Sequence, residues 1–166
     1  MVDFVVDTNV LAFVDEPRED MTEEEIPCVE ACLEWLTGFD MAGPDRVVID
    51  HDYRILTEYR TYTNRRPGGF AHNWLNQLMS NFGTSIDPVA IQFDDNGYAI
   101  LPDSLPFDDM ADRKFIAVTL KHSPMPSIIN ATDTDWSKQK AMLEANGIDV
   151  VELCPDYIAE KLAGKS

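Results

Sequence analysis

The sequence predicts an α/β fold, a three-layer sandwich in which helices flank a central, mostly parallel sheet. Short apolar runs of strand length alternate with longer segments whose apolar residues recur at helical spacing. Such alternation is typical of parallel sheets, because a helix makes each crossover. The chain has 166 residues, 45% of them hydrophobic, which suits one packed core. We therefore expect a single domain over residues 1–166.

Turn and capping residues punctuate the first half of the chain. Asp7 ends an apolar run and begins a polar turn that can cap a helix, and Asp50 stands in the same position after a second run. Gly38 ends one helical pattern, and the Arg65–Gly69 segment, which contains Pro and two Gly residues, breaks another. The expected elements are strands at 4–6 and 46–49 and helices at 24–38, 51–63 and 70–82.

The second half predicts a β-hairpin and then a return to strand–helix alternation. Asn96 and Gly97 lie between two strand-like runs, which is a strong hairpin signal. This hairpin, over residues 89–101, is an insertion into the parallel sheet. Gly147 ends the penultimate helical pattern. The remaining expected elements are strands at 127–131 and 148–153 and helices at 108–121, 136–146 and 156–163.

Four acidic residues occupy positions from which their side chains can meet. Asp7 and Asp133 each follow an expected strand, and Glu58 and Asp112 lie on expected helices. In an open α/β sheet, ligands bind at the carboxyl ends of the strands. Converging carboxylates repel one another unless they are protonated or hold a cation. The pattern therefore predicts a site for a hard divalent metal ion, and hence phosphate chemistry.

The segments around these acids resemble the motifs of PIN-domain nucleases. Val5–Leu11 resembles the opening strand of that family, and Glu58 resembles its second acid. Asp112–Leu120 is similar to the helix that carries the third acid. Asn130–Trp136 resembles the strand-end motif with the fourth, where an Asp-x-Asp pair precedes an aromatic residue. The four motifs occur in the family's order and span nearly the whole chain.

The resemblance implies a metal-dependent hydrolase that cleaves phosphodiester bonds, usually in RNA, through one or two Mg²⁺ or Mn²⁺ ions. A bound ion of this kind lowers the pKa of its water and so supplies the attacking hydroxide. Asp109 shares a helix face with Asp112, so it either assists the metal or caps the helix, and the same two roles are open for Asp135. The catalytic candidates are Asp7, Glu58, Asp112 and Asp133, and the metal candidates are these four with Asp109 and Asp135.

Basic residues beside these motifs are candidates for contact with a nucleic-acid backbone, although a solvated loop would look the same. They are Arg65 and Arg66 after the Glu58 helix, and Arg113 and Lys114 next to Asp112. The net charge of −17 is unusual for a nucleic-acid binder. We therefore expect a homo-oligomer or a protein partner, such as the antitoxin of a toxin–antitoxin pair or another subunit of a defence or RNA-processing complex.

Two other functions compete with the nuclease. A haloacid-dehalogenase-like phosphatase also begins with a strand that ends in Asp, but it requires a second Asp where this chain has Asn9. A non-catalytic acidic module that binds a protein would account for the net charge. It gives no reason for four acids to converge.

The cysteines and the apolar runs predict a cytoplasmic protein with no membrane association. The three cysteines, Cys28, Cys32 and Cys154, are an odd number, and we expect reduced thiols. The three histidines complete no known zinc spacing. No apolar run approaches the ~20 residues of a membrane span, and the N-terminal residues lack the pattern of a signal peptide.

Overall fold

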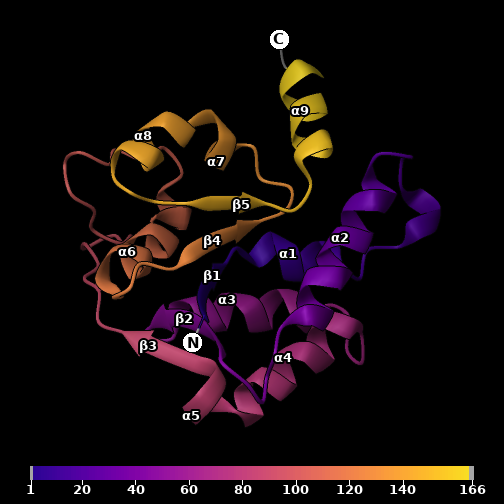
Figure 1. The fold of residues 1–166 in the computed structure, drawn as a ribbon, viewed down its shortest axis with the longest axis horizontal. Coiled ribbons are helices and arrows are strands. Elements are labelled where there is room, and N and C mark those ends of the chain that lie inside the picture. The colour runs from indigo at the N-terminus through magenta and orange to yellow at the C-terminus, as the bar shows by residue number, and fades with distance from the viewer. Residues whose placement is uncertain (1, 165–166) are drawn as a thin grey trace.

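The computed structural model of the protein describes residues 2–164, and its centre is a five-stranded parallel sheet. The strands lie in the order β3–β2–β1–β4–β5, so β1 is in the middle. Phe4 of β1 pairs with Val47 of β2 on one side and with Ser127 of β4 on the other. The predicted α/β class with a parallel sheet flanked by helices is confirmed (Figure 1). The strands are β1 (Val2–Val6), β2 (Asp45–Asp50), β3 (Ile86–Val89), β4 (Ser127–Asn130) and β5 (Val150–Glu152).

Helices connect the strands and cover the sheet. Helix α6 packs across β1, β2 and β4, whereas α1, α2, α3 and α4 pack against one another. None of the helices in residues 2–164 is both long and apolar enough to cross a membrane. The helices are α1 (Thr8–Phe13), η1 (Arg18–Asp20), α2 (Glu25–Gly38), α3 (Arg54–Thr63), α4 (Phe70–Ser80), α5 (Phe82–Ser85), η2 (Met110–Asp112), α6 (Arg113–Lys121), α7 (Asp135–Lys138), α8 (Lys140–Ala145) and α9 (Pro155–Gly164).

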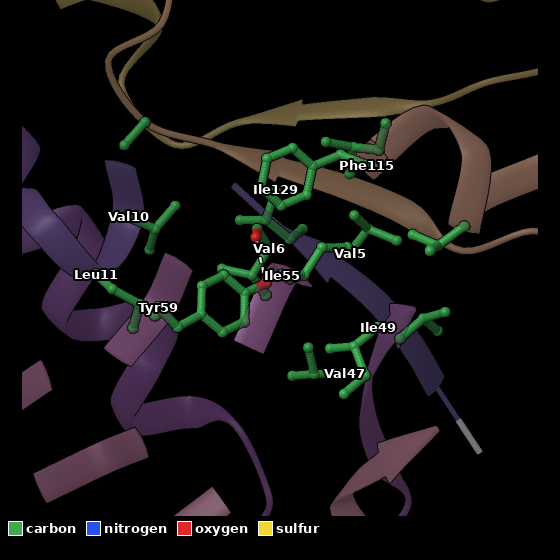
Figure 2. Packing of buried hydrophobic residues seen from close by; sticks show 14 of the residues in the cluster. Val5, Val6, Val10, Leu11, Val47, Ile49, Ile55, Tyr59, Phe115 and Ile129 are labelled. Atoms are coloured by element: carbon green, nitrogen blue, oxygen red, sulfur yellow. Dashed lines mark hydrogen bonds between the residues drawn. The ribbon is translucent and has the colours of Figure 1, made fainter. Parts of the chain in front are cut away.

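The core forms around β1 and fixes the helices that carry the acidic residues. Val5 and Val6 are fully buried, and side chains of α1, α3 and α6 pack around them (Figure 2). The hydroxyl of Tyr59, on α3, donates a hydrogen bond to the carbonyl oxygen of Val6. This buried bond ties α3 to the carboxyl end of β1, one residue before Asp7.

The hairpin insertion and the edge of the sheet differ from expectation in extent. The first strand of the expected hairpin does not begin at residue 89, because β3 already ends there. Strand β3 contains Pro88, which has no backbone N–H, and it lies at the edge of the sheet, where a proline is tolerated. The hairpin is reduced to one antiparallel bridge between Phe93 and Ala99. The helix expected over 108–121 begins as the 3₁₀ turn η2, and the helix expected over 136–146 divides into α7 and α8.

The expectation of three reduced cysteines is wrong for two of them. Cys28, on α2, and Cys154, just before α9, form a disulfide, and Cys32 is free and buried. The two partners are 126 residues apart in sequence, and the fold brings their Cα atoms to 5.1 Å, which is within disulfide range. Sequence spacing cannot reveal such a pair. The single domain expected over 1–166 also includes residues 1, 165 and 166, which lie outside the described residues.

Candidate metal centre

Three of the four predicted acids meet at the carboxyl ends of the two central strands. Asp7 follows β1, Asp133 follows β4, and Asp112 comes from the turn that begins α6. The backbone N–H of Asp7 donates to the carbonyl of Ile129, at 2.9 Å, which extends the pairing of the two strands. One carboxylate oxygen from each of Asp7, Asp112 and Asp133 lies within 4.8 Å of the other two.

The side chain of Asp7 is held in place by two donors. Trp136, on α7, donates from Nε1 to Asp7 Oδ2 at 2.6 Å, and the backbone N–H of Asn9 donates to Oδ1 at 3.3 Å. Trp136 is fully buried, and Asp7 is only 4% exposed. The indole therefore has a second role, the orientation of a carboxylate, which sequence reasoning missed.

An asparagine pair fixes the loop that carries Asp133. Asn9 Nδ2 donates to Asn130 Oδ1 at 2.9 Å, and Asn9 Oδ1 accepts from the backbone N–H of Ala131 at 3.0 Å. Asn130 Nδ2 in turn donates to the carbonyl of Asp133 at 2.8 Å. The start of α1 is thus bonded to the end of β4, and the two aspartate-bearing segments hold each other. An Asn at each of two adjacent strand ends is the sequence signal for this bridge.

Glu58 borders the same site without joining the close group. Its carboxylate accepts a hydrogen bond from the hydroxyl of Thr8, and it forms an ion pair with Lys114 Nζ at 3.4 Å. Glu58, Asp7, Asp112 and Asp133 line one cavity of about 210 Å³. The other residues that line it are Thr8, Asn9, Ala12, Tyr62 and Thr132.

Burial and mutual repulsion make it costly for all carboxylates of this acidic cluster to be charged at once. Burial raises the pKa of Asp7 to about 7, and the charges of Asp133 and Glu58 add to this, although the Trp136 hydrogen bond lowers it. Burial also raises the pKa of Asp112 to about 9, helped by the charge of Asp7 and a hydrogen bond with Asp133. At neutral pH the cluster therefore retains a proton, or it binds a cation in its place.

A second group of acids adjoins the first and shares Asp133 with it. Carboxylate oxygens of Asp109, Asp133 and Asp135 also lie within 4.8 Å of one another. Asp109 additionally accepts from the backbone N–H groups of Ala111 and Asp112 and so caps η2. The backbone N–H of Asp135 donates to Asp133 Oδ1 at 2.8 Å. The capping role left open for Asp109 is therefore present, and it leaves the carboxylate beside the site.

The donor set fits Mg²⁺ or Mn²⁺. Both ions take oxygen ligands, and Mg²⁺ is usually bound through one or two carboxylates together with water and substrate oxygens. Asp7, Asp112 and Asp133 supply oxygens at one point, and burial raises the pKa values of Asp7 and Asp112. The neighbouring group, through the shared Asp133, could hold a second ion.

The four basic residues proposed to contact nucleic acid have different surroundings in the structure. Lys114 contacts Glu58, and the Arg65 guanidinium lies 4.3 Å above the ring of Tyr62, which lines the cavity. Arg66 instead lines a different cavity that contains Glu16, Asp20 and Glu25. Arg113 donates from Nε to the carbonyl of Phe107 at 2.8 Å. Of these four, Lys114 and Arg65 thus contact side chains that line the acidic cavity.

Comparison of the chain with protein-family models, with curated proteins and with solved structures found no match in any of the three.

Proposed function

We propose that the protein is a metal-dependent nuclease of the PIN-domain type that hydrolyses phosphodiester bonds, with RNA as its favoured substrate. The observation that carries this proposal is the convergence of Asp7, Asp112 and Asp133 at the carboxyl ends of β1 and β4. The preference for RNA comes from the resemblance of the four acidic motifs to that family. A binding module gives no account of this convergence, and a haloacid-dehalogenase-like phosphatase requires a second Asp where this chain has Asn9.

Different residues would have different roles in such a site. When bound, Mg²⁺ or Mn²⁺ supplies an activated water and neutralises charge on the phosphate. The carboxylates of Asp7, Asp112 and Asp133 would hold it, and the Trp136 indole orients the Asp7 carboxylate. Lys114 neutralises Glu58 at the border of the site, which lowers the repulsion felt by an approaching phosphate.

The charge of the chain supports a role for a partner. Phosphate neutralisation supplies most non-specific affinity for nucleic acid, and a net charge of −17 opposes it. The proposed nuclease therefore engages its substrate weakly when alone, and a basic partner, such as an antitoxin or another complex subunit, or a homo-oligomer supplies or regulates contact.

Cleavage assays on matched polymers test the proposal. Single-stranded RNA and DNA of one sequence are incubated with the parent in Mn²⁺, in Mg²⁺ and in chelator. Asp133→Asn and Asp112→Asn are compared with Asp103→Asn, an exposed aspartate in the loop before η2. Removal of residues that orient metal ligands costs about 10- to 100-fold, so loss of a ligand should cost at least as much. The control should cleave as the parent does.

The outcomes separate the candidate functions. Cleavage that persists in Asp133→Asn comes from another protein or another site. If the pure parent, with metal and its natural partner, cleaves neither polymer, the acidic protein-binding module becomes the better account of the chain.

A further inference from the structure

A second and larger cavity opens next to the acidic one. It measures about 420 Å³ and lies between α3, the hairpin turn at 93–99 and the start of α6. Glu58 and Tyr62 line both cavities, so the two meet along α3. The volume falls within the roughly 300–1,000 Å³ of small-ligand sites. We call this cavity the hairpin groove.

The lining of the hairpin groove combines aromatic rings with positive charge. Phe93, Tyr98 and Tyr62 contribute rings, and Tyr98 is 38% exposed. Arg54 and Lys114 contribute the cations. Among the described lining residues, Glu58 is the carboxylate, and Lys114 pairs with it. In a chain with a net charge of −17, this groove is a surface without excess negative charge.

The hairpin turn that carries Tyr98 is held rigidly against α3. The Asp94 side chain accepts from the backbone N–H groups of Asn96 and Tyr98, at 2.9 and 3.0 Å. Arg54 donates to the carbonyl of Gly97 at 2.8 Å, and its guanidinium lies 3.9 Å above the Phe93 ring. Gly97 has φ 84°, and a Cβ there would come within 3.1 Å of Arg54. The turn therefore requires glycine, and these bonds fix the backbone of Tyr98 at the groove.

We propose that the hairpin groove binds an unpaired nucleotide next to the phosphate to be cleaved, and so selects single-stranded nucleic acid. This inference rests on the proposed nuclease function for the position of that phosphate. An exposed ring accepts the face of a base only when the base is not stacked in a duplex. The base would stack on Tyr98, and Lys114 would lie between this nucleotide and the acidic cavity.

Binding can be measured without cleavage, which separates this inference from the proposed function. The Asp133→Asn protein, in Mn²⁺ and low salt, is titrated against a fluorescent single-stranded 12-nucleotide RNA and against the same RNA in a duplex. The readout is fluorescence anisotropy. Tyr98→Ala and Tyr98→Phe are added to this background. The matched control is Phe70→Ala, an aromatic side chain with the same 38% exposure that does not line the groove.

Stacking predicts a specific pattern of affinities. Tyr98→Ala should weaken binding of the single strand about 5- to 150-fold, the range observed when a stacking ring is removed. Tyr98→Phe retains the ring and should bind within about twofold of the background, as should Phe70→Ala. The duplex should bind more weakly than the single strand.

Three results would overturn the assignment of the groove: no measurable binding of the single strand, equal binding of the duplex, or equal losses in Tyr98→Ala and Phe70→Ala. If binding depends on Tyr98 but the parent cleaves no polymer, the inference stands and the nuclease function falls. If the parent cleaves and Tyr98→Ala binds normally, the nuclease stands and the groove assignment falls.

Discussion

Asp7→Asn should stabilise the metal-free protein, and by more at alkaline than at acidic pH. Burial and the charges of Asp133 and Glu58 raise the pKa of Asp7 from 3.8 to about 7. Between these values the folded protein keeps a proton that the unfolded chain has released. The free energy of unfolding therefore falls as pH rises. One pKa unit corresponds to about 1.4 kcal/mol, so the two units between pH 5 and pH 7 correspond to about 2.7 kcal/mol.

The substitution removes this loss because an amide does not titrate. Like a protonated carboxyl group, it is uncharged and has one carbonyl oxygen acceptor and one donor group, so it imitates the low-pH form of Asp7 beside Trp136. Neutralising Asp7 also lowers the pKa of Asp112, since the charge of Asp7 is one of its causes, and this acts in the same direction. The gain in stability from Asp7→Asn should thus be about 2–3 kcal/mol larger at pH 8 than at pH 5.

Urea unfolding in chelator at the two pH values measures this difference by linear extrapolation. The parent, Asp7→Asn and the exposed control Asp103→Asn are compared, and the control should follow the parent. A gain from Asp7→Asn that is equal at both pH values, or larger at pH 5, would refute the reasoning, because the buried cluster would then not hold Asp7 protonated.

Four further outcomes are expected. Saturating Mn²⁺ at pH 8 should raise the melting temperature of the parent more than that of Asp7→Asn. Trp136→Phe, which removes the indole donor to Asp7, should lower the affinity for Mn²⁺ as measured by calorimetry. Burial lowers the pKa of His122, but its hydrogen bonds and nearby carboxylates outweigh this effect and raise the pKa above 6.5. The stability that protonated His122 contributes is complete below pH 6.5 and is lost as pH rises through its folded-state pKa. In urea unfolding, His122→Gln should therefore reduce the fall in the free energy of unfolding between pH 6 and pH 9. Cys28→Ser or Cys154→Ser should each lower the free energy of unfolding under oxidising conditions by about 2–5 kcal/mol and have little effect in reductant; equal effects in both conditions would contradict a disulfide.

The position of the acids could be anticipated because it follows from the fold class. The apolar run at 4–6 and the run at 127–131 predict buried strands, and the two strands are parallel neighbours in the structure. A carboxylate that follows each of them must then lie at the same edge of the sheet. Asp112 could be placed because the inward-facing Phe115 and Ile116 orient its helix against that sheet.

Features that depend on contacts between distant segments could not be anticipated. Strand β3 contains Asp87 and Pro88, and its composition gives no strand pattern. The ion pair of Lys114 with Glu58 joins residues 56 positions apart, and only the fold reveals it. Arg65 and Arg66 are adjacent in sequence, yet Arg65 lies over the ring of Tyr62 and Arg66 lines a separate cavity, because neighbouring side chains in a turn point in different directions.

The hydrophobic core holds the acidic cluster together against its own repulsion. Main-chain pairing of β1 with β4 and the Asn9–Asn130 bridge hold the segments of Asp7 and Asp133 together, and the bond from Tyr59 to Val6 ties α3 to the end of β1. A ligand at about 100 times its Kd stabilises the folded state by about 2.7 kcal/mol, which matches the loss expected from Asp7 between pH 5 and pH 7. A divalent ion at that saturation would offset the cost of the cluster. The same ion would therefore contribute to the stability of the fold and to the proposed chemistry.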